Sequence, residues 1–191
     1  MTTYKPLHHH VPNGLVSPGS GEAVTPFSSP TRRWLPQITY VPTSKWKNAT
    51  EQSFPPNPVV AFDYVGHSNQ GVSMRAIHHG SAPQLDGSDD PVLQYTGLQK
   101  ITLRIIWPGY EYITFSRVIE IVRPSGPITR SDLAAVVSAN FCRYLEKAKS
   151  SPSTETEWTV GPSSVRFEHL ILVSLVNVWE NVWQAAIATD C

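Results

Sequence analysis

The stretch "IIWPGYEYITFSRVIEIV", residues 105–122, places Trp-Pro-Gly-Tyr between two runs of apolar and β-branched residues. Proline presets φ for the second position of a β-turn, and glycine accepts the positive φ that the third position can require. Before the turn, Ile101, Leu103 and Ile105 alternate with polar residues, which is the period of a strand with one buried face. The stretch therefore predicts an antiparallel hairpin that turns at Pro108-Gly109.

The strand after this turn alternates in the same way until Arg117, where the phase of the alternation slips. An extra residue in one strand of a pair has this effect on the pattern. We therefore expect a β-bulge near Arg117.

A helix is predicted over residues 130–149. Thr129 and Asp132 have the spacing of a capping box, in which the hydroxyl satisfies a free N–H of the first turn. Lysines follow in the last turn, where the helix dipole favours cations. The apolar residues that recur at helical spacing are Leu133, Val136, Val137, Phe141, Tyr144, Leu145 and Ala148.

Three further segments complete the expected fold. "VVAFDYVG" (59–66) and "GVSMRAIHH" (71–79) are typical of short strands. The segment "FEHLILVSLVNVWENVWQAAIAT" (167–189) fits a helix or two strands, and its valine content favours a hairpin-like pair. The fold class is therefore α+β, with an antiparallel sheet of five to seven strands and one main amphipathic helix packed on one face.

Proline divides the chain. Ten of its 17 prolines precede residue 59, and proline interrupts both helices and central strands. We therefore predict a largely extended, Pro-rich arm over residues 1–56 and a compact α+β domain over residues 57–191. Within the arm, "RRWLPQITYVPTSKW" (32–46) is too apolar for a fully solvated tail, so we expect part of it to pack on the domain as an edge segment or short strand.

Charge and apolar patterns argue against two classes of partner. The chain has 15 basic and 15 acidic residues, whereas nucleic-acid binders carry a basic excess. No run approaches the roughly 18 apolar residues of a membrane-spanning helix, and "MTTYKPLHHH" does not resemble a signal peptide. We expect a cytoplasmic location, with the nucleus as an alternative, and reduced Cys142 and Cys191. Without a glycine-rich phosphate motif, we expect no cofactor.

Four segments together resemble a known family. They are "FD" at 62–63, "KITLRIIWPGY" at 100–110, "ITRSDLA" at 128–134 and "VRFEHLILVSL" at 165–175. In this order they resemble an uncharacterised family, a domain of unknown function, of mushroom-forming (basidiomycete) fungi. The likeness covers about residues 58–188. It implies a fungal source and a compact α+β domain, but no activity.

Histidines suggest a metal site. Asp63, His67, His78 and His79 are near one another in the sequence and offer the two-His, one-carboxylate ligand set of non-haem iron enzymes. The alternative is that His78 and His79 are two solvated loop histidines. The triplet His8–His10 can hold a metal ion only weakly, because adjacent residues cannot close a tetrahedral site. His169 beside Glu168 is either a hydrogen-bonded structural histidine or half of an acid–base pair.

Aromatic residues suggest a contact surface for a protein or a sugar ring. They gather at the predicted hairpin and near the C-terminus, and are Trp107, Tyr110, Tyr112, Trp179 and Trp183. The alternative is that these rings close the open ends of a small core.

Four Ser/Thr-Pro pairs offer phosphorylation sites for proline-directed kinases. They begin at Ser17, Thr25, Ser29 and Ser151. A phosphate beside Arg32 and Arg33 would rearrange that segment electrostatically.

The expected function is a non-enzymatic protein-interaction or structural domain. We expect a protein partner, with a second copy of the chain as one candidate, and the arm as a docking or regulatory segment. One alternative is a metal-dependent enzyme or binder that uses the Asp63 and histidine group. Another is a carbohydrate-binding module that uses Trp107 and Tyr110.

Overall fold

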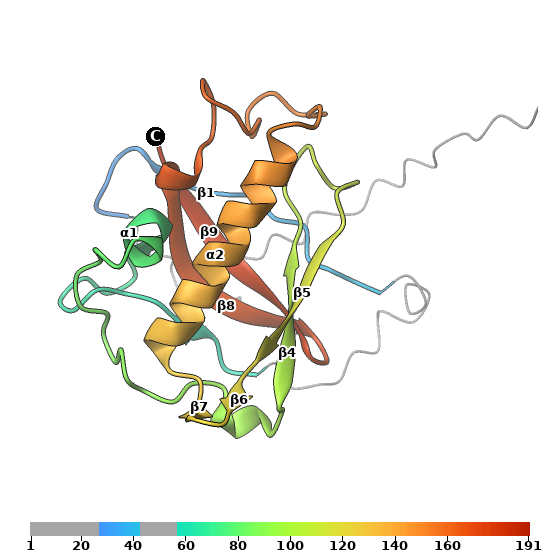
Figure 1. Cartoon of the computed structure of the whole chain (residues 1–191). Helices are drawn as coiled ribbons and strands as arrows, with labels where there is room; N and C mark the ends of the chain where they lie inside the picture. The colour runs from blue at the N-terminus through green and yellow to red at the C-terminus, as the bar shows by residue number, and fades with distance from the viewer. Residues whose placement is uncertain (1–26, 43–56) are drawn as a thin grey trace, which may run out of the picture.

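The computed structural model of the chain describes residues 27–42 and 57–191. Figure 1 shows one twisted sheet, with the long helix α2 lying across one of its faces and the short helix α1 next to it. The predicted α+β class with one main helix is confirmed, and the sheet of seven strands agrees with the predicted five to seven. The predicted division at residue 56 lies outside the described residues and stays a prediction.

The sheet joins strands that are distant in the chain. Its main path is β2 (Val60–Ala61), β8 (Leu170–Trp179), β9 (Val182–Asp190), β4 (Lys100–Ile105) and β5 (Phe115–Glu120). In addition, β1 (Arg32–Trp34) pairs with β9, and β3 (Val72–Ser73) pairs with β8. The pair of β4 with β9 is parallel, so the sheet is mostly antiparallel rather than entirely so.

The predicted C-terminal hairpin is confirmed as β8 and β9, which turn at Glu180-Asn181. The side-chain amide of Asn177 closes the turn, because its Nδ2 donates to the carbonyl oxygens of Glu180 and Val182 at 2.8 and 3.0 Å. Two register shifts in β8 bend the pair. Leucine and valine on both faces of β8 suit a central strand that is covered on both sides.

The turn at Pro108-Gly109 is confirmed, but the hairpin around it is wider than predicted. The Tyr110 N–H donates to the Trp107 carbonyl at 2.9 Å, and Gly109 has a φ of +80°. Pairing of β4 with β5 nevertheless stops at Ile105 and Phe115. The loop leaves the sheet because Trp107 Nε1 donates to the carbonyl of Trp158 at 2.8 Å and the Tyr110 hydroxyl accepts from the Val160 N–H at 3.0 Å.

Helix α2 (Arg130–Ala148) begins and packs as predicted. The Thr129 hydroxyl accepts a hydrogen bond from the Asp132 N–H at 3.2 Å. Leu133, Val137 and Phe141 are at most 1% exposed and belong to one buried cluster with the inward residues of β4, β5 and β9. This helix therefore covers the sheet face that carries Leu103, Ile105 and Trp183.

Two sequence predictions about local structure are wrong, the first of them in part. Of residues 71–79, only Val72–Ser73 form a strand (β3), because α1 (Met74–His78) begins directly after it with Ser73 as its N-cap. The bulge expected near Arg117 is absent from the register of β4 with β5, which runs unbroken from Lys100↔Glu120 to Ile105↔Phe115. Arg117 is on the same face of β5 as Phe115 and Ile119, which is the face toward α2, but its side chain is exposed. Its guanidinium lies over the Phe115 ring, 5.3 Å from the centroid, so the charged group stays in water while the stem covers apolar surface.

Short elements complete the described part. A two-stranded sheet is formed by β6 (Val122–Arg123) and β7 (Gly126–Pro127). Two 3-10 turns, η2 (Gln94–Thr96) and η3 (Phe167–His169), precede β4 and β8 respectively. Both Cys142, which is half-buried in α2, and the exposed Cys191 are free thiols.

Candidate functional site

The described part of the arm adds to the sheet as an extra strand. β1 pairs antiparallel with the end of β9, with Arg32 opposite Asp190 and Trp34 opposite Ala188. Beyond β1, the Leu35 N–H donates to the Ile187 carbonyl at 2.9 Å. The prediction that part of residues 32–46 packs as an edge segment is thus confirmed for β1, which Figure 1 shows beside the end of β9.

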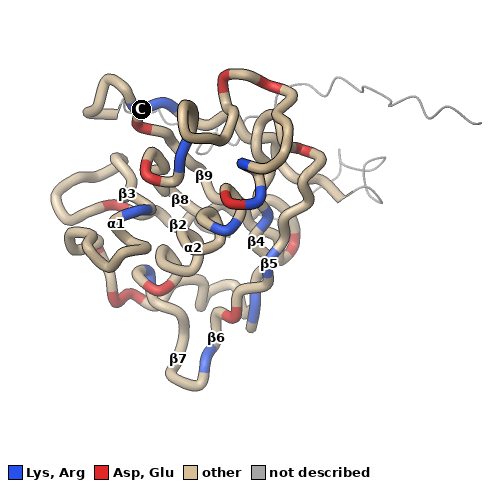
Figure 2. The backbone as a smooth tube through the Cα atoms, turned by 45° about the horizontal axis from the view of Figure 1, so that its top comes forward, with Lys and Arg blue, Asp and Glu red and all other residues tan. Residues whose placement is uncertain are grey.

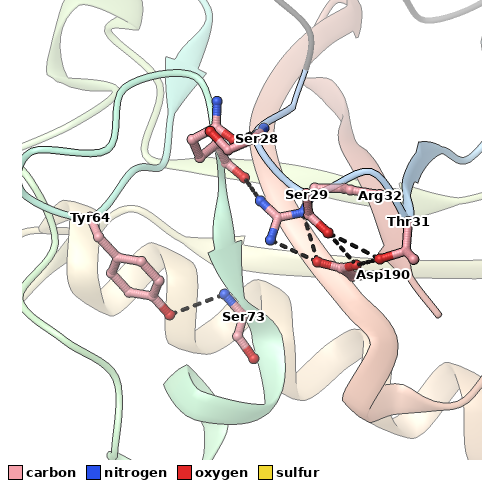
Figure 3. A network of polar contacts seen from close by, with 8 residues as sticks. Ser28, Ser29, Thr31, Arg32, Tyr64, Ser73 and Asp190 are labelled. Atoms are coloured by element: carbon pink, nitrogen blue, oxygen red, sulfur yellow. Dashed lines mark hydrogen bonds and ion pairs between the residues drawn. The ribbon is translucent and has the colours of Figure 1, made fainter.

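Asp190 is the anchor of this strand. Its Oδ1 accepts hydrogen bonds from the hydroxyls of Ser29, at 2.9 Å, and Thr31, while its Oδ2 accepts from Nε and Nη2 of Arg32 at 3.1 and 2.9 Å. Figure 3 shows these side chains converging on the carboxylate. Burial acts to raise the pKa of Asp190, but the three hydrogen-bond donors and the guanidinium charge bring it below its usual value.

The same network reaches a third segment of the chain. Arg32 Nη1 donates to the Gln70 carbonyl at 2.5 Å, and the Gln70 side-chain oxygen accepts from the Ser28 N–H at 2.7 Å. The loop around Gln70 is itself fixed, because the Asp63 carboxylate accepts from the N–H groups of residues 69–71 at 2.8–2.9 Å. The arm, the end of β9 and the 63–71 loop therefore form one connected polar site.

Gln184 holds the arm further along its course. This residue of β9 is fully buried on the sheet face turned away from α2, where the arm passes behind the sheet in Figure 1. Its Oε1 accepts from the Tyr40 N–H at 2.7 Å, and its Nε2 donates to the Ile38 carbonyl at 3.1 Å. The arm is thus bound first at a strand edge and then across a face.

The outer side of β5, the last strand on the main path of the sheet, offers an edge with which no described strand pairs. β4 covers one side of β5, and within residues 27–42 and 57–191 no strand pairs with the other side. Ser116, Arg117 and Val118 are exposed in succession, and Val118 is 59% exposed. Alternate residues of such a strand direct their N–H and C=O groups outward, where a further strand can bind.

Four of the five aromatic residues proposed as contacts are buried. Trp107, Tyr110 and Trp183 are at most 1% exposed, and Trp179 is 8% exposed. In this structure their rings therefore pack inside the protein, which agrees with the alternative that they close the core. Tyr112 differs, since it is 55% exposed, with its hydroxyl donating to the Pro152 carbonyl.

The residues proposed as metal ligands do not converge. The Asp63 carboxylate is occupied by loop amides, as described above, and His67 is exposed in the same loop. His78 and His79 lie at the end of α1, with ring centroids 5.6 Å apart, and His78 packs edge-on against Phe167. Over residues 27–42 and 57–191, no three His, Cys, Asp or Glu side chains are placed to hold a metal ion.

His169 is held by a neighbouring cation rather than paired with Glu168. The Arg166 N–H donates to its Nδ1 at 3.3 Å, and Arg166 Nη2 lies 3.1 Å from its Nε2. Glu168 instead forms an ion pair with Arg166 at 3.2 Å. This arrangement corresponds to the structural interpretation of His169.

Two of the proposed phosphorylation sites fall in the described part. Ser29 is half-buried in the Asp190 network, and the Ser151 hydroxyl, at the end of α2, donates to the Lys147 carbonyl at 3.4 Å. Ser17 and Thr25, like the His8–His10 triplet, lie outside the described residues.

A pocket of about 330 Å³ lies between β2 and the start of α2, lined among others by Val59, Pro91, Tyr95 and Arg130. Its cation is already engaged, because Arg130 Nη1 donates to the Ala61 carbonyl at 2.6 Å and Nη2 lies 3.5 Å from Asp90. No helix among the described residues is long and apolar enough to cross a membrane.

The sequence did not identify the residues that hold the arm. Asp190 and Arg32 are 158 positions apart and meet only because β1 pairs with β9. No local sequence pattern predicts such a contact. Gln184 did offer a signal, since a glutamine in the apolar run "VWQAAIA" (182–188) is a polar group that burial forces to find partners.

Comparisons with protein-family models, with curated proteins and with solved structures found no match for this chain. The fungal resemblance and the expected cytoplasmic or nuclear location therefore stay predictions, and the case for a function depends on the geometry.

Proposed function

We propose that this chain is a non-enzymatic protein-interaction domain that self-associates through the outer edge of β5. The observation that carries the proposal is the outer side of β5, with which no described strand pairs and at whose middle Val118 is exposed. An exposed apolar residue on an unpaired strand is unusual, because edge strands generally carry features that prevent further pairing.

A second copy fits this edge in one register better than in its neighbours. A twofold axis perpendicular to the sheet preserves its two faces, so the strands must pair residues that share a face. With Val118 on the axis, Val118 meets its own copy, and Ser116 lies opposite Glu120. A register centred on Arg117 would place two arginines opposite each other, which is unfavourable.

Charge distribution is consistent with a protein partner rather than a nucleic acid. Figure 2 shows basic and acidic residues interspersed along the backbone. In the edge strand itself, one base at Arg117 and one acid at Glu120 balance each other. A nucleic acid would favour a surface with a basic excess.

The test is the oligomeric state of the full chain at increasing concentration, measured by sedimentation velocity. We expect a dimer that dissociates on dilution, and we expect Val118→Lys to be monomeric because two lysines would meet on the axis. Val65→Lys is the matched control, since Val65 is 56% exposed but lies in a loop. It should dimerise like the unaltered chain.

A chain that stays monomeric at every concentration would contradict the proposal. A dimer that survives Val118→Lys but dissociates in Asp190→Asn would also contradict it, because its copies would then be held together by exchanged arms rather than by β5.

A further inference from the structure

The hydroxyl of Ser29 is bonded directly to an anion. Its Oγ donates to Asp190 Oδ1 at 2.9 Å, within the cluster that Figure 3 shows. Among the described residues, Arg32 is the cation that pairs with this carboxylate, at 2.9 Å. The two charges cancel, so the cluster is neutral as long as position 29 carries a hydroxyl.

Ser29 is followed by Pro30, and the pair is the minimal recognition sequence of proline-directed kinases. We propose that Ser29 is a phosphorylation site and that its phosphate keeps residues 28–35 from binding to β9. The inference depends on the docking of the arm and is independent of the β5 contact proposed above.

The modification is an ordinary phosphoryl transfer from a nucleoside triphosphate. Ser29 Oγ attacks the γ-phosphorus of ATP, the bond from that phosphorus to the bridging oxygen breaks, and ADP leaves. The hydroxyl proton passes to the catalytic base of the kinase. Nothing is oxidised or reduced.

The hydroxyl becomes accessible by local opening. Ser29 is half-buried, whereas Ser28, Pro30 and Thr31 beside it are exposed. β1 pairs with β9 over only three residues. Short segments at the edge of a sheet open at a much lower free-energy cost than the core, so a kinase can reach Ser29 without unfolding the domain.

Once added, the phosphate opposes reclosing. It carries a charge of about −2 at neutral pH and only accepts hydrogen bonds, so a donor to Asp190 becomes a repelling group. The net charge of the cluster changes from zero to about −2. Arg32 can neutralise one of the three negative charges, and the repulsion that remains favours the open arm.

The second Ser-Pro pair in the described part provides a control. Ser151 precedes Pro152, but its hydroxyl faces the Lys147 carbonyl rather than a carboxylate. Ser151 lies at the end of α2, near Lys147 and Lys149, and takes no part in the Asp190 cluster. A negative charge there should therefore leave the docking of the arm unchanged.

The test uses amide hydrogen exchange in the full chain, measured by NMR. The Leu35 amide, which donates to Ile187, reports on the arm, and the Thr102 amide, which donates to Asn181, reports on the rest of the sheet. The variants are Ser29→Ala, Ser29→Glu, Ser29→Glu with Asp190→Asn, and Ser151→Glu. Ala removes the hydrogen bond alone, whereas Glu also adds the negative charge.

We expect Ser29→Glu to accelerate exchange at Leu35 by at least about tenfold over Ser29→Ala, with Thr102 unchanged. Adding Asp190→Asn should remove most of the difference between Glu and Ala, and Ser151→Glu should exchange as the unaltered chain does. If Ser29→Glu exchanges no faster than Ser29→Ala, the electrostatic release is wrong.

The site itself is tested by incubating the full chain with ATP and a panel of purified proline-directed kinases. We expect mass spectrometry to place a phosphate on Ser29, and the modified chain to exchange at Leu35 as Ser29→Glu does. A panel that leaves Ser29 unmodified overturns the assignment.

Discussion

The side-chain amide of Gln184 binds the main chain at Tyr40 as a neighbouring strand would. It accepts from the Tyr40 N–H at 2.7 Å and donates to the carbonyl two residues earlier at 3.1 Å, while the glutamine is fully buried. Removing such an amide leaves two main-chain groups of the arm without their partner.

Gln184→Met should therefore destabilise the protein. It removes both hydrogen bonds with little change in volume, and we expect the free energy of unfolding to fall by about 1–3 kcal/mol. Urea titration followed by tryptophan fluorescence measures the loss. Gln84→Met, at an exposed loop position, is the control and should stay within about 0.5 kcal/mol of the unaltered chain. Equal losses in both variants would contradict the role of Gln184.

Asp190 should make the free energy of unfolding decrease at acid pH. Its pKa in the folded state is lowered, so its contribution is complete above the unfolded pKa of about 3.9 and is lost as pH falls through the lower folded value. Asp190→Asn has no charge to lose. We expect its urea midpoint to be lower than that of the unaltered chain at neutral pH and to change less on acidification. Parallel pH profiles would disprove this linkage.

Removing the hydroxyl should have different effects on protein stability at two buried tyrosines. The Tyr110 hydroxyl accepts from the Val160 N–H at 3.0 Å, so Tyr110→Phe should cost about 1–2 kcal/mol. The Tyr144 hydroxyl has no hydrogen-bond partner in the described part, and burial, followed by the charge of Glu111, raises its pKa. Tyr144→Phe should be neutral or stabilising in thermal melts. A larger loss for Tyr144→Phe than for Tyr110→Phe would refute the assignment.

Two glycines with the same backbone conformation should differ in their tolerance of alanine. Gly66 and Gly109 have φ values of +81° and +80°, and a Cβ at Gly66 would meet nothing within 4 Å. Gly66→Ala should thus lower the free energy of unfolding by only about 1–2 kcal/mol, which is the cost of backbone strain at a positive φ. A Cβ at Gly109 would lie 2.9 Å from the Glu155 nitrogen, so Gly109→Ala should lose about 1–3 kcal/mol more. If the two variants have similar melting temperatures, the 153–155 segment moves aside for the added Cβ and the prediction is wrong.

The elements that the sequence predicted well are those specified by neighbouring residues. Thr129 and the apolar spacing after it specify α2, and the Glu180-Asn181 turn joins two strands that pair along their whole length. Each depends on residues within about one element of one another, where pattern and propensity act together.

The strand predicted over residues 71–79 ends at Ser73 because the segment that follows carries helix-capping residues. Ser73 accepts from the Ala76 N–H at 3.3 Å, and Gly80 follows the helix with a φ of +66°. A serine before and a glycine after a short segment are the start and stop signals of a helix. Both signals are present in "SMRAIHHG" (73–80), beside the apolar alternation of Val72, Met74 and Ala76 that favours a strand.

The arm-binding site could not be predicted from the sequence, for a different reason. Arg32, Gln70 and Asp190 are brought together by strand pairing across most of the chain, and local patterns carry no information about which distant edge a strand will join. The buried aromatic residues illustrate the same limit, since Trp107 and Trp158 meet only after the loop leaves the sheet.

The central position of β9 has a consequence for folding. Before β9 joins the sheet, β4 and β5 can form a hairpin against α2, whereas β2 and β3 have only β8 as a neighbour. Among the described strands, no pair links these two groups until β9 emerges between them. A chain in which β9 has not yet joined the sheet therefore carries two incomplete sheets with exposed strand edges, and such edges favour aggregation.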